Sequence, residues 1–458
     1  MTILQQEPIA ALATAPGIGA IAVIRVSGTD AIELTNRIFR GKDLTQQPSH
    51  TVHFGTIRDS ANAIIDEVLV SIFRSPSSFT KEDVVEISCH GSDYVIRQIL
   101  RLLLKEGVRM AQPGEFTQRA FLNGQFDLVQ AEAVADLIAA DSEATHRAAL
   151  TQLRGGFSKQ LKALRQQLVE FAALIELELD FGEEDVEFAK RDDLRKLVLS
   201  IQRVLRPLID SFSVGNAIKN GVATVIAGKP NAGKSTLLNA LLNEEKAIVS
   251  DIPGTTRDVI EDEVFIDGIR FRLIDTAGLR EATDTIEAIG VERTKQQLDK
   301  AAIIIYLFDA AETTLAEITE VEAGLKNRNV PYLLVGNKMD KLSEAEMADW
   351  QLRFGKELVL IQANTGKHLD KMAQRLSGFV KTNAIPGSTV VTNLRHFEHL
   401  AQTDAALVRV LDGIDDGTTQ DWIALELRDA LRHLGELTGE ITTDDLLATI
   451  FSKFCIGK

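Results

Sequence analysis

The stretch that most constrains the fold is residues 228–235, GKPNAGKS, which has the spacing G-x-x-x-x-G-K-S. An apolar, β-branched run at 222–227 precedes it and a helix-like run at 236–242 follows it. In this strand–loop–helix context the glycines turn several backbone N–H groups toward one point, Lys234 adds a positive charge, and the Ser235 hydroxyl joins a magnesium shell. The stretch therefore predicts a nucleoside triphosphate site. The plain alternative is a glycine turn before a core helix.

Three further motifs indicate which nucleotide is bound. Residues 275–278, DTAG, end a β-type run, so Asp275 is expected to hold magnesium through water and Gly278 to contact the γ-phosphate. Residues 254–258, GTTRD, supply a loop threonine for magnesium. Residues 336–340, GNKMD, follow another strand-like run, and Asp340 would accept hydrogen bonds from guanine N1–H and its exocyclic amine, a pattern that adenine lacks. The four elements in this order predict a GTPase domain.

Two residues narrow the type of GTPase. Leu279 stands where Ras-like enzymes carry the glutamine that orients the attacking water, and leucine has no hydrogen-bonding group, so another residue must position the water. Asn231 stands at the variable centre of the phosphate loop, where its amide oxygen is a neutral ligand suited to a monovalent cation; the alternative is that it caps the loop. A potassium ion there would act as an arginine finger does, which contributes about 10³ to 10⁵ in rate.

The order of apolar patterns predicts a multidomain α/β and α fold. Residues 1–120 mix β-type runs at 20–26, 68–73 and 84–88 with an amphipathic helix at 92–105, which indicates an α+β domain. Residues 121–220 and 383–458 have apolar residues at helical steps of three and four, for example at Leu161, Leu164, Leu168, Phe171, Ile175 and Leu179.

Between these two helical segments, strand-like and helical runs alternate over residues 221–382, which predicts an α/β domain with a mostly parallel sheet. The strand-like runs begin near Val222, Val259, Phe271, Ala302, Tyr332 and Leu358. The simplest arrangement is one helical domain, in two segments, with the nucleotide domain inserted between them. Two segments of the N-terminal part, 25–28 (RVSG) and 113–124 (PGEFTQRAFLNG), are rich in glycine and charge and are predicted as turns.

Composition excludes several other classes. The longest convincing apolar stretch, 301–308, is only strand-sized, so no membrane span is expected. Residues 1–15 lack a basic n-region, which argues against a secretory signal, and two cysteines, Cys89 and Cys455, fit a reducing cytoplasm.

The net charge of −16, from 50 basic and 66 acidic residues, repels a polyanion at long range. An RNA substrate would need a partner protein or a local basic patch, such as Arg97, Arg101, Lys105 and Arg109; the alternative for such a patch is a solvated helix face.

These motifs resemble one family closely over essentially the whole chain: the tRNA uridine-5-carboxymethylaminomethyl modification GTPases, which act on wobble uridines with a flavoprotein. The specific marks are GKPNAGKS, GTTRD, DTAGLRE, PGEFTQRAFLNG and the C-terminal FCIGK at 454–458. The resemblance implies an N-terminal folate-binding and dimerising α+β domain, a discontinuous all-helical domain and an inserted Ras-like P-loop G domain. It also implies a homodimer with transient G-domain contact, a heterotetramer with an FAD-dependent tRNA-modification partner, and use of a 5-formyltetrahydrofolate-type folate.

The resemblance also assigns roles to residues. Glu287 matches the family's water-orienting glutamate, although from sequence alone it is a surface helix charge, and Lys234 and Cys455 complete the catalytic set. Cys455 is either a nucleophile or redox group at the folate site or a buried structural thiol. The folate pocket would comprise Arg25, Glu86, Gln125 and Lys458, although some relatives carry lysine in place of Gln125. The backbone of Ala363, within the Gln362-Ala363-Asn364 segment, is expected to contact the base. Potassium would be held by Asn231, Ser250, Ile252 and Thr255, and magnesium would be held by Ser235 and Thr256. GTP would be bound by Asn231, Ala232, Gly233, Lys234, Ser235, Thr236, Ser250, Thr255, Thr256, Asp275, Thr276, Ala277, Gly278, Asn337, Lys338 and Asp340.

The leading prediction is therefore a potassium-activated GTPase that modifies carbon 5 of a tRNA wobble uridine with a folate one-carbon unit. One alternative is a switch GTPase of ribosome assembly or membrane remodelling, which performs no RNA chemistry and predicts no folate binding. Another is a scaffold with a vestigial G domain, against which the intact Lys234, Ser235, Asp275 and Asp340 argue.

Overall fold

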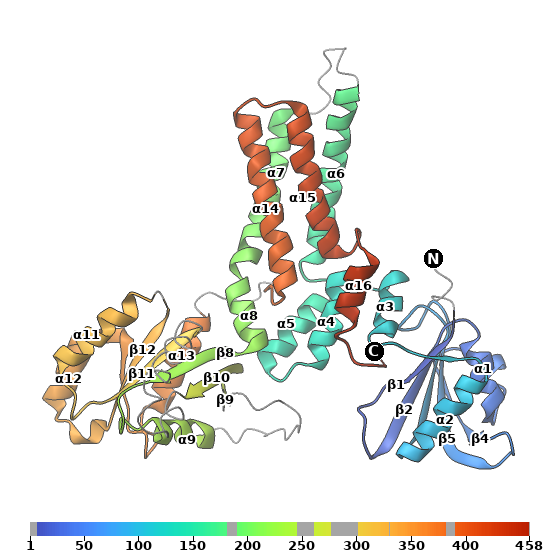
Figure 1. Cartoon of the computed structure of the whole chain (residues 1–458), viewed down its shortest axis with the longest axis horizontal. Helices are drawn as coiled ribbons and strands as arrows, with labels where there is room; N and C mark the ends of the chain where they lie inside the picture. Colours follow the sequence, from blue (N-terminus) through green and yellow to red (C-terminus); the bar gives the residue numbers. More distant parts are fainter. Residues whose placement is uncertain are drawn as a thin grey trace, which may run out of the picture. The chain divides into compact units, whose positions relative to one another are not determined.

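The computed structural model of the chain describes residues 7–180, 190–244, 261–275, 301–328, 330–381 and 390–457 (Figure 1). By contacts the chain divides into two compact units, one of residues 1–139, 149–199 and 402–458, the other of residues 140–148 and 200–401. The domain boundaries expected from the sequence, at residues 120, 220 and 382, stay predictions. Among the helices that the structure describes, none is both long enough and apolar enough to cross a membrane.

A seven-stranded sheet is the core of the N-terminal part. Its strand order is β3-β4-β5-β6-β2-β1-β7, with antiparallel neighbours except for the parallel pair β1 and β7. The three β-type runs predicted here lie in β2, β5 and β6 and are confirmed. The strands are β1 (Ile9–Leu12), β2 (Gly19–Ser27), β3 (Phe39–Arg40), β4 (Thr51–Arg58), β5 (Ile64–Phe73), β6 (Val84–Gly91) and β7 (Arg109–Met110).

Helices α1 (Ala31–Ile38) and α2 (Asp93–Lys105) cover one face of this sheet, and the predicted helix at 92–105 is confirmed. Apolar side chains of α2, such as Ile96, Ile99 and Leu103, join the inward residues of the strands in one core. Because strand side chains alternate between faces, the opposite side of β4 and β5 points away from that core. Val52, Phe54 and Leu69 on that side are 60%, 66% and 47% exposed.

The two segments predicted as turns are regular structure, so that prediction was wrong. Residues 25–27 belong to β2, and PGEFTQRAFLNG forms helix α3 (Glu115–Leu122) after Gly114, whose φ is 69°. Glu115 and Arg119 lie one turn apart and pair at 3.0 Å in a buried setting. Burial alone would raise the pKa of Glu115, but Arg109 and the Gln112 backbone N–H hold that pKa below its ordinary value. The charges that suggested a surface turn are therefore internal partners.

The helical periodicity predicted on both sides of the nucleotide domain is confirmed. Leu161, Leu168 and Ile175 of α6 are buried, as expected for a helix whose apolar residues recur at steps of three and four. Helix α15 lies beside α6, and Gln420 and Arg428 of α15 donate to Glu178 and Glu176 of α6 at 2.8 Å each. The helices are α4 (Leu128–Ile138), α5 (Glu143–Leu153), α6 (Ser158–Asp180), α7 (Arg191–Asp210), α8 (Phe212–Asn220), α14 (Leu394–Asp415), α15 (Gln420–Thr438) and α16 (Asp444–Phe451).

A six-stranded sheet of order β13-β12-β11-β8-β10-β9 forms the core of the nucleotide domain. All neighbours are parallel except β9, so the mostly parallel sheet is confirmed; the predicted start at Val259 lies outside the described residues. Helices α9 and α13 pack on one face of the sheet, and α11 and α12 on the other. The elements are β8 (Val222–Ala227), α9 (Lys234–Glu244), β9 (Glu261–Ile266), β10 (Ile269–Asp275), β11 (Ile303–Asp309), α11 (Leu315–Lys326), β12 (Tyr332–Asn337), α12 (Glu344–Phe354), β13 (Leu358–Leu360) and α13 (Leu369–Lys381).

Strand β8 lies between β10 and β11, so the chain leaves its carboxyl end at the point where the strand order reverses. Ligands of open α/β sheets bind in the crevice at such a point. The phosphate-loop motif begins there, directly after Ala227, and the fold thus places it where a nucleotide would be bound.

Candidate functional site

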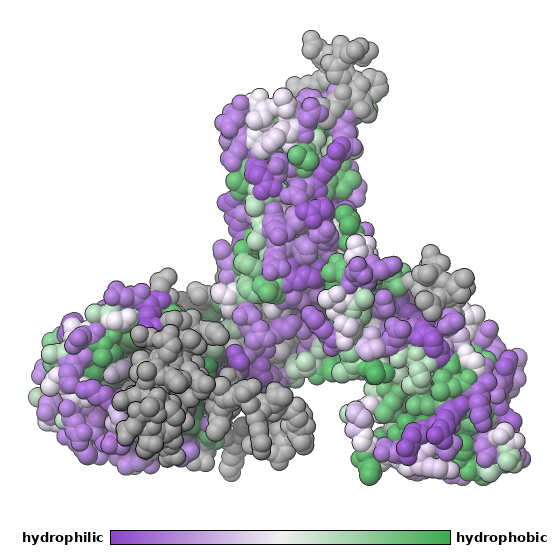
Figure 2. Space-filling model, viewed as in Figure 1, coloured by the Kyte–Doolittle hydropathy of each residue, from purple (hydrophilic) through white to green (hydrophobic). Residues whose placement is uncertain are grey.

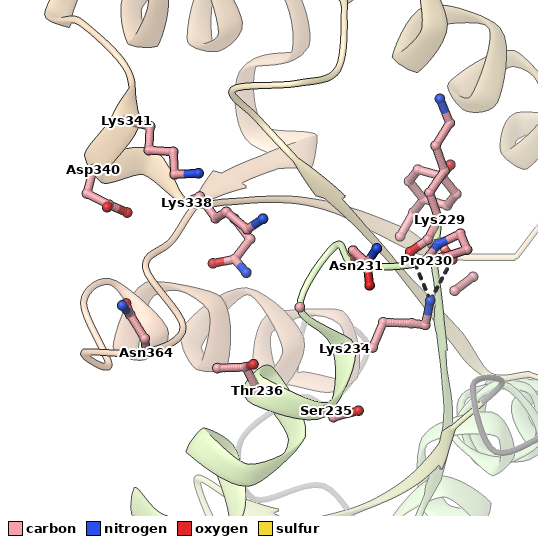
Figure 3. Close-up of a pocket in the computed structure, with 15 residues that line it drawn as sticks. Lys229, Pro230, Asn231, Lys234, Ser235, Thr236, Lys338, Asp340, Lys341 and Asn364 are labelled. Carbon is pink, nitrogen blue, oxygen red and sulfur yellow. Dashed lines mark hydrogen bonds between the residues drawn. The ribbon is translucent and has the colours of Figure 1, made fainter.

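The phosphate loop lines a cavity of about 1010 Å³ (Figure 3). Gly228 has a φ of 154°, and a Cβ there would lie 2.0 Å from the carbonyl oxygen of Leu307 in β11. Only glycine fits that position, because the loop packs directly against the neighbouring strand. The cavity is lined by Ala227, Gly228, Lys229, Pro230, Asn231, Gly233, Lys234, Ser235, Thr236, Tyr306, Asn337, Lys338, Asp340, Lys341 and Asn364.

Lys234 and Ser235 begin helix α9, so the loop's N–H groups and the positive end of the helix dipole face the same cavity. The Lys234 ammonium donates to the backbone oxygens of Gly228 at 2.7 Å and Lys229 at 3.0 Å, the two dashed contacts in Figure 3. The hydroxyls of Ser235 and Thr236 are exposed to the cavity. This is the arrangement that binds the phosphates of a nucleotide.

Asn231 has a φ of 63°, in the left-handed region, and is exposed. Within the residues that the structure describes, its side-chain amide makes no hydrogen bond, so the loop-capping alternative has no contact to support it. The amide faces the cavity together with Lys234. An amide oxygen in that position fits a monovalent cation beside the phosphates.

Asn337 connects the phosphate loop to the guanine side of the cavity. Its buried side chain donates to the Ala232 carbonyl at 3.0 Å and accepts from the Ala363 backbone N–H at 3.0 Å. Gly233 is required here, because a Cβ on it would lie 2.3 Å from the Asn337 amide nitrogen. The Ala363 N–H, which the sequence suggested as a base contact, is thus used to hold Asn337.

On the guanine side, Lys338, Asp340 and Asn364 line the cavity. The Lys338 ammonium lies 2.6 Å from the Asp309 carboxylate at the end of β11. Burial alone would raise the pKa of Asp309, but Lys338 and the Ala311 backbone N–H hold it below its ordinary value. Asp309 therefore stays charged and fixes Lys338 next to Asp340. Sequence reasoning missed Asp309, although a carboxylate at the carboxyl end of a parallel strand is a recognisable signal.

Two more contacts at the phosphate loop were missed. Tyr306 of β11 lines the cavity, and the Lys229 ammonium pairs with Glu317 of α11 at 2.7 Å. Neither partner has a local sequence signal, because Tyr306 and Glu317 follow Ser235, the last residue of the loop, by more than seventy residues. The other predicted nucleotide and ion ligands lie outside the described residues: Ser250, Ile252, Thr255, Thr256, Thr276, Ala277, Gly278 and Glu287, while of Asp275 only its place at the end of β10 is described.

Two of the four predicted folate residues, Arg25 and Glu86, are in contact in the N-terminal part. Arg25 of β2 donates to Glu86 of β6 at 2.9 Å and to the Gly457 carbonyl at 3.4 Å, with its side chain 14% exposed. Its guanidinium lies over the rings of Phe79 and Phe116, 5.5 and 5.7 Å from their centroids. The two rings and the Glu86 carboxylate therefore hold the Arg25 guanidinium in place.

Gln125 is exposed, and among the described residues its side chain contacts neither Arg25 nor Glu86, although the ring of its neighbour Phe126 lies 5.8 Å from that of Phe79. Lys458, the fourth predicted folate residue, lies outside the described residues. The C-terminal segment is seated on the N-terminal part: the Gly114 backbone N–H donates to the Cys455 carbonyl at 3.3 Å. A Cβ on Gly457 would lie 2.3 Å from the Leu12 carbonyl oxygen, so this approach requires glycine.

We expect a thiol reagent under native conditions to react quickly with Cys455 alone. Cys455 is exposed, which excludes the buried-thiol alternative, whereas Cys89 is 4% exposed and burial raises its pKa to about 11. Because the thiolate is the reactive form, Cys89 should stay inert. Ellman titration of the wild type and of Cys455→Ser measures this. Two thiols reacting at one rate, or fast reaction remaining in Cys455→Ser, would contradict the expectation.

Comparisons with known proteins show which family the chain resembles. Residues 8–125 match the family described as GTP-binding protein TrmE N-terminus, and residues 128–455 match the family described as MnmE helical domain. The tRNA modification GTPase MnmE of Cytophaga hutchinsonii is 55% identical over 453 residues, which cover 99% of this chain and 98% of that protein. The protein of the same name from Flavobacterium johnsoniae is 50% identical over 467 residues, covering 99% and 100%.

Among solved structures, Era in complex with MgGDPNP and nucleotides 1506–1542 of 16S ribosomal RNA is 28% identical, over 40% of this chain and 66% of that one, at a TM-score of 0.28. The two family matches together span nearly the whole chain, and the curated relatives match it from end to end. The chain therefore belongs to the MnmE family of tRNA modification GTPases.

Proposed function

We propose that this protein is a potassium-activated GTPase that works in the cytoplasm with an FAD-dependent partner. Together they would modify carbon 5 of the wobble uridine of certain tRNAs, with a one-carbon unit from a tetrahydrofolate. The family establishes the broad class, a GTPase of tRNA modification. The observation that carries the finer proposal is the meeting of Arg25, Glu86 and Gly457 in one site, which a generic GTPase has no reason to contain.

The GTPase step rests on the cavity at the phosphate loop. Lys234 and the loop N–H groups would hold the phosphates, and Asp340 would select guanine. Magnesium would be held by Ser235 and, outside the described residues, Thr256. The Asn231 amide would contribute to a potassium site with backbone groups of Ser250, Ile252 and Thr255. When bound, potassium supplies positive charge against the charge that develops between the β- and γ-phosphates. Glu287 is proposed to orient the water.

The folate site rests on the packing around Arg25. A pterin ring is flat, with hydrogen-bonding edges, and the partly exposed guanidinium, Glu86 carboxylate and Phe79 ring would offer it polar and aromatic contacts side by side, with the buried Phe116 ring packed behind the guanidinium. Folate would supply the one-carbon unit. The exposed thiol of Cys455, two residues before Gly457, is proposed to act in this chemistry, and Gln125 and Lys458 to complete the site.

A homodimer is proposed through the uncovered face of the N-terminal sheet. Val52, Phe54 and Leu69 form adjacent positions on β4 and β5, and Ile21 on β2 is 68% exposed. A second copy would remove this apolar surface from water, as stable homodimer interfaces do. The FAD-dependent partner would then complete a heterotetramer, and the G domains would meet transiently.

The folate proposal predicts that Arg25→Ala weakens binding of 5-formyltetrahydrofolate at least about tenfold, because a hydrogen bond to a charged group contributes about 1.5–3 kcal/mol. GTP hydrolysis should be unchanged. Isothermal calorimetry on the full chain measures the first and phosphate release the second, with Arg58→Ala as an arginine control in the same domain. No folate binding by the wild type would favour a switch GTPase without RNA chemistry.

The modification itself is tested by mass spectrometry of tRNA nucleosides after reconstitution with the FAD-dependent partner, GTP, folate and potassium. The expected product carries an aminomethyl-type group at carbon 5 of the wobble uridine. Omitting potassium or folate should each prevent its formation. Cells that lack the gene but keep fully modified wobble uridines would refute the proposal.

A further inference from the structure

Helix α2 carries a stripe of positive charge on its outer side. Arg97, Arg101 and Lys105 recur at steps of four residues, and Tyr94 precedes them by three. At 100° per residue these four side chains lie within an arc of about 80°. All four are exposed, Tyr94 at 61%, whereas Ile96 and Ile99 on the inner side are buried. We call these four residues the α2 stripe.

The protein does not use these charges internally. Among the described residues, Arg101 and Lys105 form no ion pair or hydrogen bond, and Arg97 donates only to the backbone oxygen of Asp93, at 3.1 Å. Arg109, which the sequence grouped with them, differs: its guanidinium pairs with Glu115 and Glu7. In a chain of net charge −16, the α2 stripe is a local surplus of positive charge.

The positive region continues past the end of α2. Arg37 of α1 reaches Glu106 at 3.4 Å, and the neighbouring Arg40 donates only to backbone carbonyls, those of Arg37 at 2.9 Å and Phe39 at 3.0 Å. Glu106 is the single carboxylate in these contacts. Past the C-terminal end of α2, the two arginines and Glu106 together add one net positive charge.

The fold keeps this surface accessible. Helices α1 and α2 cover one face of the N-terminal sheet, and the uncovered face is the one proposed for a second copy of the chain. The α2 stripe would therefore remain exposed in the dimer and occur twice. Figure 2 shows strongly hydrophilic side chains at the surface where α2 lies in Figure 1.

We propose that the α2 stripe binds the phosphate backbone of tRNA, with Tyr94 stacking on an unpaired base. This inference rests on the proposed tRNA substrate. Four residues of helix rise about 6 Å, so the three cations form an evenly spaced row along a strand of phosphates. Cations in a row with an exposed aromatic are the features of single-stranded RNA sites. An acidic protein partner fits less well, because protein interface cores are depleted of charge.

The test measures binding of a full-length tRNA transcript to the full chain as a function of salt. The variant Arg97→Gln/Arg101→Gln/Lys105→Gln is expected to bind more weakly and to lower the slope of log K against log salt by about 2 to 3. Lys356→Gln/Lys371→Gln/Arg375→Gln is the matched control, because it removes the same charge from exposed positions of the G domain. The control should keep the wild-type slope.

A second arm tests the aromatic side chain. Tyr94→Ala is expected to weaken tRNA binding about fivefold or more, while Tyr94→Phe keeps it, because stacking needs the ring and not the hydroxyl. GTP hydrolysis and the thermal unfolding temperature should be those of the wild type in every variant. If the triple variant fails to fold, Arg101→Gln alone should lower the salt slope by about 1.

Three results would overturn the inference. Equal loss of affinity in the α2 and control triples would mean that only total charge matters. Unchanged binding in both would place the RNA contacts elsewhere. Normal tRNA binding with lost affinity for the FAD-dependent partner would make the α2 stripe a protein contact. In all three cases the wobble uridines could still be modified, so failure here is distinct from failure of the proposed function, which the loss-of-gene measurement detects.

Discussion

Asp340→Asn is expected to lower the affinity for GTP by about 10² to 10⁴-fold and to raise the affinity for xanthosine triphosphate. The carboxylate of Asp340 would accept two hydrogen bonds from guanine, and each bond to a charged group contributes about 1.5–3 kcal/mol. An asparagine amide instead presents a donor, which clashes with the guanine amine and matches the second carbonyl of xanthine. Asp340 lines the cavity beside Lys338, which Asp309 holds in place at 2.6 Å.

Fluorescence titration with methylanthraniloyl-labelled GDP and XDP measures this exchange. Asp349→Asn, at an exposed position of α12, is the matched control and should leave both affinities unchanged. Unaltered GTP binding by Asp340→Asn would mean that another residue selects the base. Loss of both nucleotides would point to a collapsed site, which the thermal unfolding temperature distinguishes.

Removing the Asn231 amide is expected to abolish the preference of GTP hydrolysis for potassium over sodium. If the cation acts as an arginine finger does, kcat should fall by about 10³-fold or more. Asn231 has a φ of 63°, so alanine there also strains the backbone. Asn231→Gly removes the amide and keeps that conformation without strain, which separates the two effects.

The measurement is kcat at saturating GTP in potassium and in sodium at one ionic strength, for the wild type, Asn231→Gly and Asn231→Ala. Asn239→Ala, an exposed asparagine on α9, is the control and should respond to potassium as the wild type does. Equal rates in both salts for the wild type, or a full potassium response in Asn231→Gly, would remove the cation mechanism.

The parts of the fold that the sequence predicted are those with strong local periodicity. Phe271 and Tyr332 mark strands because β-branched and apolar runs of strand length are buried on both faces of a parallel sheet. Leu161 and Leu168 mark a helix because one stripe of it meets the core. In each case the apolar residues that predict the element are also the residues that pack in the core.

The sequence failed where partners lie far away along the chain. Residues 113–124 suggested a surface turn because the burial of Arg119 depends on distant partners, the Glu82 carboxylate at 3.3 Å and the Glu7 carbonyl at 2.8 Å, which a local pattern does not reveal. The same holds for Asp309 opposite Lys338 and for the rings around Arg25. The strand–loop–helix setting of the phosphate loop was predicted from its spacing, whereas the contacts that hold the loop depend on tertiary structure.

The contact between Arg25 and the Gly457 carbonyl has a consequence for biosynthesis. The two residues are 432 positions apart in the chain. At about 5–20 residues per second, a ribosome needs about 20 to 90 s to make the segment between them. The strands of the N-terminal sheet can pair in that interval, but Arg25 cannot contact the Gly457 carbonyl until the C-terminal segment has been made. Newly made chains should therefore form the N-terminal sheet early and complete the proposed folate site late.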